Sequence, residues 1–326
     1  MVNDKLTVKN VTLDTRIIMP PIATYQSSED GKVTDGMLTY YGARARNPHV
    51  SLITTEHCFI HQQGKAKPKQ MSISDDSDIP GLARLVAAIH DGGAKAICQI
   101  NHAGSASPTA TTGMPVVGPS PVILPSSPIM GDNVAPNELT ANQIADIVRW
   151  FAEAAVRAKK AGYDGVEIHS AHAYLLNQFY SPLTNKRTDE YGGSLDKRLN
   201  IHREVIAAVR KAVGDEYLIS LRLGGCDYAE GGSTIADSVY ASKVFETAGV
   251  DMLSISGGMC RYTIPGHNEP GYFKEMTLAI KKEVKIPVLL TGGVKTLQEA
   301  EDLLAEGAAD LIGVGRELLK SPNWEN

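Results

Sequence analysis

TANQIADIVRWFAEAAVRAKKAGYDGVEIH, residues 140–169, carries the pattern that decides the fold. Thr140 and Gln143 have the spacing of a capping box, in which side chains satisfy free amide groups at the start of a helix. Apolar residues then recur at helical spacing and form one apolar stripe, until Gly162 ends the helix. GVEIH, residues 165–169, follows and is interpreted as a strand. The stretch therefore predicts one amphipathic helix followed by one strand.

The same alternation of strand and helix extends over almost the whole chain. After a short N-terminal hairpin, formed by LTVKN and VTLD, strands are predicted over residues 16–19, 50–55, 95–100, 165–169, 217–223, 252–256, 287–291 and 310–314. Helices are predicted over residues 35–47, 79–92, 140–162, 195–213, 235–248, 274–284 and 296–307, with a short helix after the last strand.

This alternation predicts an α/β fold with a parallel sheet that is covered by helices. Eight units without a linker between them favour one closed (β/α)8 TIM barrel, a single domain over residues 1–326 that begins with the short β-hairpin. An open doubly wound sheet would usually bind a dinucleotide through a glycine-rich turn after its first strand. That turn is MPPIA here, residues 19–23, without the motif GxGxxG. The closed barrel is therefore the predicted fold.

Composition argues against several classes of function. The net charge is −5 and no cluster of Lys and Arg stands out, so a nucleic-acid partner is not expected. The N-terminus lacks the apolar core of a signal peptide, and no apolar run reaches the ~18 residues of a membrane span. We therefore expect a cytoplasmic protein. The cysteines lie far apart without a CxxC pair, which predicts buried thiols rather than an iron–sulfur cluster: Cys58, Cys98, Cys226 and Cys260.

The C-terminal ends of the predicted strands carry polar side chains and glycines. In a (β/α)8 barrel the active site lies at this end. In order, the strand ends present Pro21, Ala23, Glu56, His57, Gln99, His169, His172, Arg222, Ser256, Gly292, Gly293, Gly315 and Arg316. Two long loops, 102–138 and 257–271, follow the third and sixth strands. They are predicted to be lids or binding loops. The alternative is that they are solvent-exposed loops without a functional role.

The last two strands end in TGGV (291–294) and GVGR (313–316), where this fold usually holds a phosphate. Glycines let backbone N–H groups approach a phosphate closely. The guanidinium of Arg316 is permanently charged and can donate two parallel hydrogen bonds to a phosphate. Tight turns alone are the alternative explanation. Because both loops show the pattern together, a phosphate site is favoured.

Arg222 ends a strand whose other residues look buried. A buried arginine usually needs an anionic partner. Glu56 or Glu167 would satisfy it within the protein. The alternative is a ligand that becomes anionic during the reaction.

His169 and His172 form an HxxH pair at the end of the fourth strand. Two metal ligands fit this spacing if Glu56, His57 or His102 adds a third. Two ordinary polar loop residues fit it as well. A nearby buried guanidinium would repel a divalent cation, so a metal site is not expected.

Taken together, these residues resemble the old yellow enzyme family of FMN-containing NAD(P)H-dependent oxidoreductases. The most specific stretch is HSAHAYLLNQFYSPLTNKRTDEYGGSLDKR, residues 169–198. RIIMPPIATY, QINHAG, LRLGG, TGGV and GVGRELL follow the family's order, so the resemblance covers residues 16–322. Within the long motif, Arg187, Asp189, Ser194 and Arg198 are interpreted as loop braces and a helix cap rather than as site residues.

The resemblance implies how an FMN cofactor would be held. Pro20, Pro21, Ile22 and Ala23 would run beside the flavin ring, with His57 where relatives place a small residue. Gln99 would hydrogen-bond the pyrimidine side, and Arg222 would lie near N1 and O2, where negative charge collects on reduction. The phosphate would be held by Gly292, Gly293, Gly315 and Arg316.

The resemblance also implies the reaction. NADH or NADPH would reduce the flavin, and N5 would return the hydride to the β-carbon of an activated alkene, such as an enone, or to a nitro compound. His169 and His172 would donate hydrogen bonds to the substrate oxygen, and Tyr174 would protonate the α-carbon. Tyr25 would line the pocket. The expected partner is a small-molecule substrate, and a homo-oligomer is compatible with this expectation.

Besides His57, the sequence departs from the family pattern at three places. Ala23 replaces the usual Thr or Cys, whose side chain tunes the flavin, so a lower reduction potential is expected. Ser105 stands where the family often has Arg, which puts one anion contact in doubt. Ala173 replaces the usual Gly, which is expected to be a small change.

Other functions remain as alternatives at this point. One is an NAD(P)H oxidase or another flavin dehydrogenase with a different acceptor. Another is a flavin-binding protein without catalytic activity. A third keeps the barrel as a metal-dependent lyase or hydrolase that uses His169 and His172.

Overall fold

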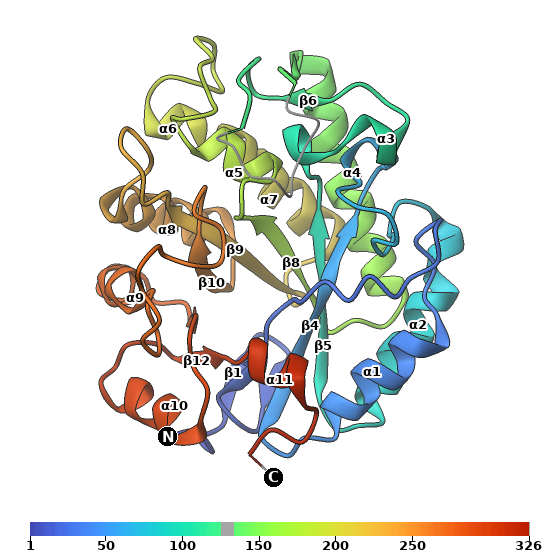
Figure 1. Cartoon of the computed structure of the whole chain (residues 1–326), viewed down its shortest axis with the longest axis vertical. Coiled ribbons are helices and arrows are strands. Elements are labelled where there is room, and N and C mark those ends of the chain that lie inside the picture. The colour runs from blue at the N-terminus through green and yellow to red at the C-terminus, as the bar shows by residue number, and fades with distance from the viewer. Residues whose placement is uncertain (125–133, 326) are drawn as a thin grey trace.

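Eight parallel strands close into a barrel in the computed structural model, which describes residues 1–124 and 134–325 (Figure 1). Around the barrel the strand order is β10-β11-β12-β3-β4-β5-β8-β9. The strands are β3 (Ile17–Met19), β4 (Val50–Phe59), β5 (Lys95–Asn101), β8 (Gly165–Ser170), β9 (Leu218–Cys226), β10 (Met252–Gly257), β11 (Val288–Thr291) and β12 (Leu311–Gly313). The predicted (β/α)8 barrel is confirmed.

The predicted N-terminal hairpin is also confirmed. It consists of β1 (Leu6–Val8) and β2 (Val11–Leu13), paired antiparallel. Val8, Val11 and Leu13 pack in one buried cluster with residues from the starts of the barrel strands. Burial of each such side chain contributes roughly 1.5–3 kcal/mol. The hairpin therefore closes the N-terminal end of the barrel and leaves the opposite end for the site.

Helices cover the outside of the barrel, with α1, α2 and α4 on one side of Figure 1 and α8, α9 and α10 on the other. Their bounds are α1 (Asp35–Ala45), α2 (Ile79–His90), α4 (Ala141–Lys160), α7 (Asn200–Val213), α8 (Ile235–Ala248), α9 (Lys274–Lys281), α10 (Leu297–Ala305) and α11 (Arg316–Lys320). Both predicted capping boxes form, at Thr140 with Gln143 and at Thr296 with Glu299. Helix 195–213 is interrupted at Leu199, so that α6 (Leu195–Arg198) precedes α7.

Three further features differ from or extend the sequence prediction. β4 continues to Phe59, with a register shift between Thr55 and Cys58, so Glu56 and His57 lie inside the strand instead of after it. Such an irregularity turns side chains in a new direction. β9 likewise continues past Arg222 to Cys226. A short helix, α5 (Leu175–Tyr180), follows the two histidines and was not predicted.

The two long loops have different local structure. Region 102–138 contains η3 (Gly104–Ala106), α3 (Thr109–Thr112), β6 (Val117–Gly118) and β7 (Asn137–Glu138), and its residues 125–133 lie outside the described ones. Region 258–271 contains no helix or strand. Two further turns, η1 (Gln62–Gly64) and η2 (Asp76–Asp78), lie between β4 and α2.

The remaining scaffold predictions are largely confirmed. Arg187 Nη2 lies 2.5 Å from Asp189 Oδ2, and the Ser194 side chain caps α6. All four cysteines are free and three are buried, whereas Cys260 is partly exposed. Over residues 1–124 and 134–325, no helix is long and apolar enough to span a membrane.

Candidate active site

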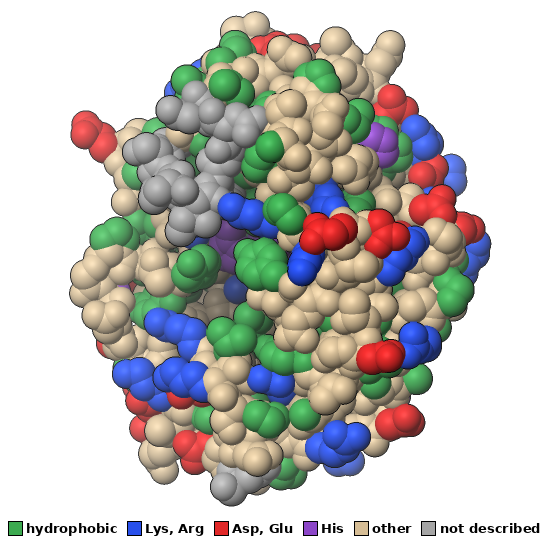
Figure 2. All heavy atoms as spheres, turned by 45° about the vertical axis from the view of Figure 1, so that its right-hand side comes forward, with side chains coloured by type: hydrophobic (Ala, Val, Ile, Leu, Met, Phe, Trp, Pro, Cys, Tyr) green, Lys and Arg blue, Asp and Glu red, His purple; other side chains and the backbone are tan. Residues whose placement is uncertain are grey.

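A cavity of about 410 Å³ opens at the C-terminal end of the barrel. Every site residue predicted from the sequence lines it: Pro20, Pro21, Ile22, Ala23, Tyr25, His57, Gln99, His169, His172, Tyr174, Arg222, Gly292, Gly293, Gly315 and Arg316. Figure 2 shows the surface hollowed on this side, with histidine inside the hollow and Lys and Arg side chains around it. A cavity of this size is in the range of small-molecule and cofactor sites.

His169, His172 and Tyr174 converge on one wall of the cavity. The ring centroid of His169 lies 5.1 Å from that of His172 and 5.1 Å from that of Tyr174. His169 belongs to β8, whereas the other two lie in the turn that leads into α5. Nε2 of His172 lies 2.7 Å from Oγ of Ser256, near the end of β10, which is separated from β8 by β9. The fold therefore fixes three polar rings around a common space.

The turn that presents these rings has an unusual backbone. His172 and Ala173 both adopt left-handed conformations, with φ of 61° and 62°. The left-handed conformation costs a residue with a Cβ roughly 1–2 kcal/mol of conformational energy, and glycine avoids that cost. The replacement of the usual glycine by Ala173 is therefore not the small change expected from the sequence. It places local strain directly beside the candidate catalytic residues.

Burial sets the protonation states of the three rings. Burial first, and neighbouring positive and imidazole groups second, hold the pKa of His169 and of His172 well below the usual 6.5. Burial also raises the pKa of the Tyr174 hydroxyl above its usual value of 10.0. At neutral pH the two imidazoles are uncharged hydrogen-bonding groups, and the tyrosine keeps its proton.

His57 is oriented by a glutamine that the sequence analysis did not single out. The Ala66 backbone N–H donates to Gln70 Oε1 at 2.6 Å, which leaves Gln70 Nε2 as the donor 2.8 Å from His57 Nδ1. The proton of a neutral His57 therefore sits on Nε2. Burial lowers the pKa of His57 to about 4, so the ring is uncharged.

Arg222 is buried, and no carboxylate of the described residues is bonded to its guanidinium. Its Nε and Nη1 atoms are buried and have no hydrogen-bond partner within residues 1–124 and 134–325. Glu167, one of the two candidate partners, instead accepts hydrogen bonds from Gln99 Nε2 at 2.8 Å and from Ser220 Oγ at 3.2 Å. The other, Glu56, accepts hydrogen bonds from the backbone and side chain of Thr24. Arg222 lines the cavity, and unsatisfied donors on a buried cation fit a ligand that carries negative charge.

The glycine loops after β11 and β12 form the opposite wall. Gly292 and Gly293 have φ of 111° and 79°, and a Cβ on Gly293 would lie 2.4 Å from the carbonyl oxygen of Glu269. These positions accept only glycine, so the backbone N–H groups stay accessible to a ligand. Arg316 is exposed at the start of α11, and its Nη2 lies 3.4 Å from the Tyr272 hydroxyl. The arrangement fits a phosphate at the cavity edge.

The metal alternative finds no support in this geometry. Within the described parts of the chain, no group of three His, Cys, Asp or Glu side chains is placed to hold a metal ion. The nearest polar partner of His172 is the hydroxyl of Ser256.

Several lining residues were not predicted from the sequence: Lys67, Arg261, Tyr262, Tyr272, Thr291, Val294, Gly313 and Leu319. Most of these lie in loops or next to a predicted residue. No spacing rule connects them, because they meet only when the barrel closes. Thr291 and Gly313 carry a signal, since they belong to the TGGV and GVGR motifs.

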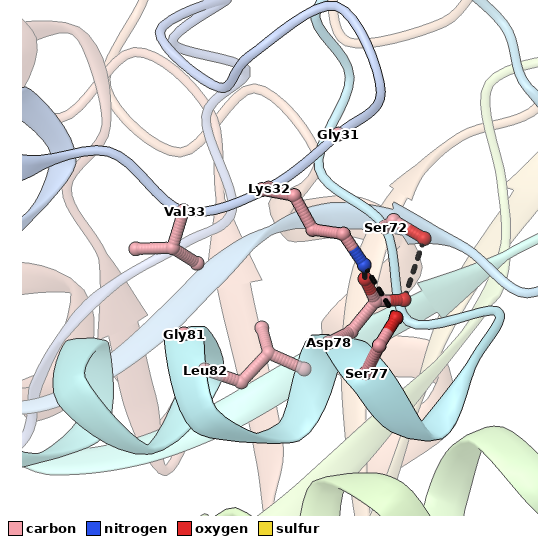
Figure 3. Close-up of a pocket in the computed structure, with 8 residues that line it drawn as sticks. All are labelled: Gly31, Lys32, Val33, Ser72, Ser77, Asp78, Gly81 and Leu82. Atoms are coloured by element: carbon pink, nitrogen blue, oxygen red, sulfur yellow. Dashed lines mark hydrogen bonds and ion pairs between the residues drawn. The ribbon is translucent and has the colours of Figure 1, made fainter.

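A second cavity, of about 220 Å³, lies between the loop before α1 and the start of α2 (Figure 3). Its polar side chains already satisfy one another. Lys32 Nζ lies 2.5 Å from Asp78 Oδ1 and 2.8 Å from Ser77 Oγ, and Ser72 Oγ donates to Asp78 Oδ2 at 2.7 Å. This cluster braces the loop.

The closed barrel carries two glycine loops, neutral histidines and, within the described residues, an arginine without a partner. These features together define a cofactor-dependent (β/α)8-barrel enzyme. The model of the NADH:flavin oxidoreductase / NADH oxidase family matches residues 4–326. The chain therefore belongs to that family. The FMN cofactor expected from the sequence is thereby confirmed, and the unpartnered Arg222 and the glycine loops fit it.

Relatives in sequence support the same assignment. The chain is 40% identical over 324 residues to an NADH oxidase of Thermoanaerobacter brockii, covering 97% of this chain but 49% of that protein. It is 39% identical to an NADPH dehydrogenase of Halalkalibacterium halodurans, covering 97% of this chain and 90% of that protein. The chain thus spans about half the length of the first relative and most of the second.

Solved structures agree with the fold. A 2-naphthoyl-CoA reductase in complex with 2-naphthoyl-CoA superimposes with a TM-score of 0.91 and 28% identity, covering 99% of this chain and 51% of that chain. An old yellow enzyme homologue from Zymomonas mobilis superimposes with a TM-score of 0.86 and 27% identity, covering 99% and 90%. The resemblance to the old yellow enzyme family is confirmed.

Proposed function

We propose that this chain reduces carbon–carbon double bonds conjugated to a carbonyl or nitro group, with NADH or NADPH as the reductant. The observation that carries the proposal is the convergence of His169, His172 and Tyr174 on the cavity that also contains Arg222. Two neutral imidazoles and a protonated phenol are suited to polarise an acceptor oxygen and to supply one proton.

FMN would lie along the wall of the cavity that is opposite His169, His172 and Tyr174. The Pro20–Ala23 segment would run beside the ring, with His57 against it, and Gln99 would hydrogen-bond its polar edge. Arg222 would place its free guanidinium N–H groups where negative charge develops. Gly292, Gly293, Gly315 and Arg316 would bind the phosphate. When bound, FMN supplies the hydride that reaches the β-carbon of the substrate.

Each polar ring would have its own role. His169 and His172 would donate hydrogen bonds to the substrate oxygen, which draws electron density away from the β-carbon. Ser256 would fix the ring of His172 through their 2.7 Å contact. Tyr174 would give its phenolic proton to the α-carbon, and Tyr25, which is 50% exposed, would line the entrance.

A second candidate is oxygen as the electron acceptor. The name of the Thermoanaerobacter brockii relative, NADH oxidase, favours it. Because this chain spans 49% of that protein, the acceptor of the whole relative need not be that of this chain. Both candidate functions begin with reduction of the flavin by NADH or NADPH. They differ in the molecule that reoxidises the flavin, an alkene in the first and oxygen in the second.

Anaerobic mixing separates these possibilities. Purified protein loaded with FMN should bleach on addition of NADPH or NADH and regain its absorption when 2-cyclohexenone is added. Recovery only after oxygen is admitted would favour the oxidase. Absence of bleaching would indicate a flavin-binding protein without activity.

A further inference from the structure

We propose that the mouth of the active-site cavity binds an anionic group, a carboxylate or a phosphate, on the acceptor substrate, with Arg261 as its principal contact. This inference rests on the proposed alkene reductase function and narrows its substrate class. It predicts that conjugated alkenes with a negatively charged substituent are preferred over neutral ones of the same shape.

The wall of the cavity is positively charged. Four cationic side chains line it: Lys67, Arg222, Arg261 and Arg316. Among the described residues, no Asp or Glu lines it. Arg222 and Arg316 are accounted for by the flavin and its phosphate. Arg261 is therefore the cation of this wall that remains to be explained by another ligand.

Arg261 lines the same cavity as His172 and Tyr174. It follows β10 in the 257–271 loop, and its charge acts on both His172 and Tyr174, although burial is the larger influence on the pKa of each. The guanidinium is thus near the proposed hydrogen-bond donor and the proposed proton donor. Lys67 lines the same cavity and adds a second positive charge.

The guanidinium of Arg261 also lacks an anionic partner among the described residues. Within residues 1–124 and 134–325, no carboxylate forms an ion pair with it, although most arginines of the fold are engaged by a carboxylate or a carbonyl. The side chain is only partly exposed, so its solvation is incomplete. A planar guanidinium fork binds a carboxylate or phosphate through two parallel hydrogen bonds.

Aromatic side chains at the mouth of the cavity indicate a second property of the expected ligand, a flat conjugated group. Tyr25 and Tyr262 are 50% and 61% exposed and line the same cavity. The ring centroid of Tyr262 lies 6.1 Å from that of His172. Exposed aromatic faces at a cavity mouth suit a flat conjugated group that lies between the reacting atoms and the anion.

Two matched substrate pairs test the proposal. 4-Carboxycinnamaldehyde and its methyl ester differ in charge but have the same enal. Crotonyl-CoA and crotonyl N-acetylcysteamine thioester have the same reacting group, but only the first carries phosphates. Reoxidation of the NADPH-reduced, FMN-loaded full chain gives kcat/KM for each, and the anionic-to-neutral ratio in each pair is the readout. The pair with the larger ratio identifies carboxylate or phosphate as the anion.

Arg261→Gln should lower that ratio about tenfold to a hundredfold, as expected for loss of a charge-assisted hydrogen bond. Arg261→Lys, which keeps the charge without the fork, should fall in between. Arg46→Gln serves as the control, because Arg46 is an exposed arginine after α1, at the opposite end of the barrel. Its ratio should equal that of the unchanged protein.

Two results would overturn the inference. One is an unchanged anionic-to-neutral ratio in Arg261→Gln. The other is an equal loss of NADPH affinity in the reductive half-reaction, which would assign Arg261 to the phosphates of the reductant. Failure of every alkene, charged or neutral, to reoxidise the unchanged protein would instead refute the proposed function itself, and the inference with it.

Discussion

His169 of β8 and Arg222 of β9 are paired in register on adjacent strands of the barrel. Because paired residues of parallel strands point to the same side, the candidate substrate contact and the candidate flavin contact lie next to each other. Burial first, and then the charges of neighbours including Arg222, keep the pKa of His169 low. One buried cation therefore serves two purposes: it opposes protonation of the histidine and offers free N–H groups to the cavity.

Removing the Arg222 charge should make the flavin harder to reduce. We expect Arg222→Gln to lower the FMN reduction potential by about 30–60 mV, if the charge contributes the 1.5–3 kcal/mol typical of bonds to ions. Arg222→Lys keeps a positive charge and should shift the potential less. Potentials measured against reference dyes check this, and a potential in Arg222→Gln at or above that of the unchanged protein would argue against a contact to the reduced flavin.

Residue 23 should influence the potential as well. Ala23 lines the cavity, but its side chain has no group that can form a hydrogen bond. Ala23→Thr should raise the potential by roughly 10–30 mV, the equivalent of one ordinary hydrogen bond. Ala23→Val has nearly the same shape without the hydroxyl and serves as the control. Equal shifts in both variants would attribute the effect to packing.

The strained turn makes a prediction about stability. Ala173→Gly should raise the free energy of unfolding by about 0.5–1 kcal/mol, because φ of 62° suits glycine. Ala171→Gly is the matched control, since Ala171 is buried in the same turn without a positive φ. It should lose about 0.5–1 kcal/mol. Urea unfolding of both variants measures the difference, and destabilisation of Ala173→Gly would contradict the strain.

Buried histidines should make the protein sensitive to acid. Burial lowers the pKa of His202 to about 3, from 6.5. Below pH 6.5 the unfolded chain binds a proton that the folded one does not, so stability is lost as the pH falls from 6.5 towards 3. Glu56, whose pKa burial raises to about 7, acts in the opposite direction between pH 4.5 and 7.

The variant His202→Gln isolates this contribution. It should reduce the slope of unfolding free energy against pH by about 1.4 kcal/mol per pH unit within the window. Unfolding in urea at several pH values from 6.5 to 4.5 measures the slope. An unchanged slope would mean that His202 is protonated in the folded protein.

Much of the fold and the candidate site could be predicted because local pattern and barrel topology coincide. The stripe after Thr140 predicts a helix, and parallel strands necessarily end on one face, so residues such as Gln99 and Arg222 could be assigned to the same cavity. The resemblance to a family then gave each one an expected role. Site residues that lie in exposed loops, or that reach the site only through contacts distant in sequence, follow no such local pattern.

The residues that escaped prediction depend on tertiary contacts. Gln70 orients His57 only because a loop returns to β4, and Arg261 reaches the cavity from a loop without helix or strand. The cost of Ala173 was underestimated because φ is not encoded by residue type alone. The extension of β4 beyond Thr55 follows from a register shift against β5, which no periodicity in β4 itself announces.

The central claim is that Tyr174 protonates the substrate above a reduced flavin. Stopped-flow measurement of the two half-reactions of Tyr174→Phe under anaerobic conditions tests it most directly. Reduction by NADPH should proceed within about twofold of the unchanged rate, whereas reoxidation by 2-cyclohexenone should slow by about 10²–10⁴-fold, the range of general acid catalysis. Equal slowing of both half-reactions, or unimpaired reoxidation by the enone, would contradict the assigned role.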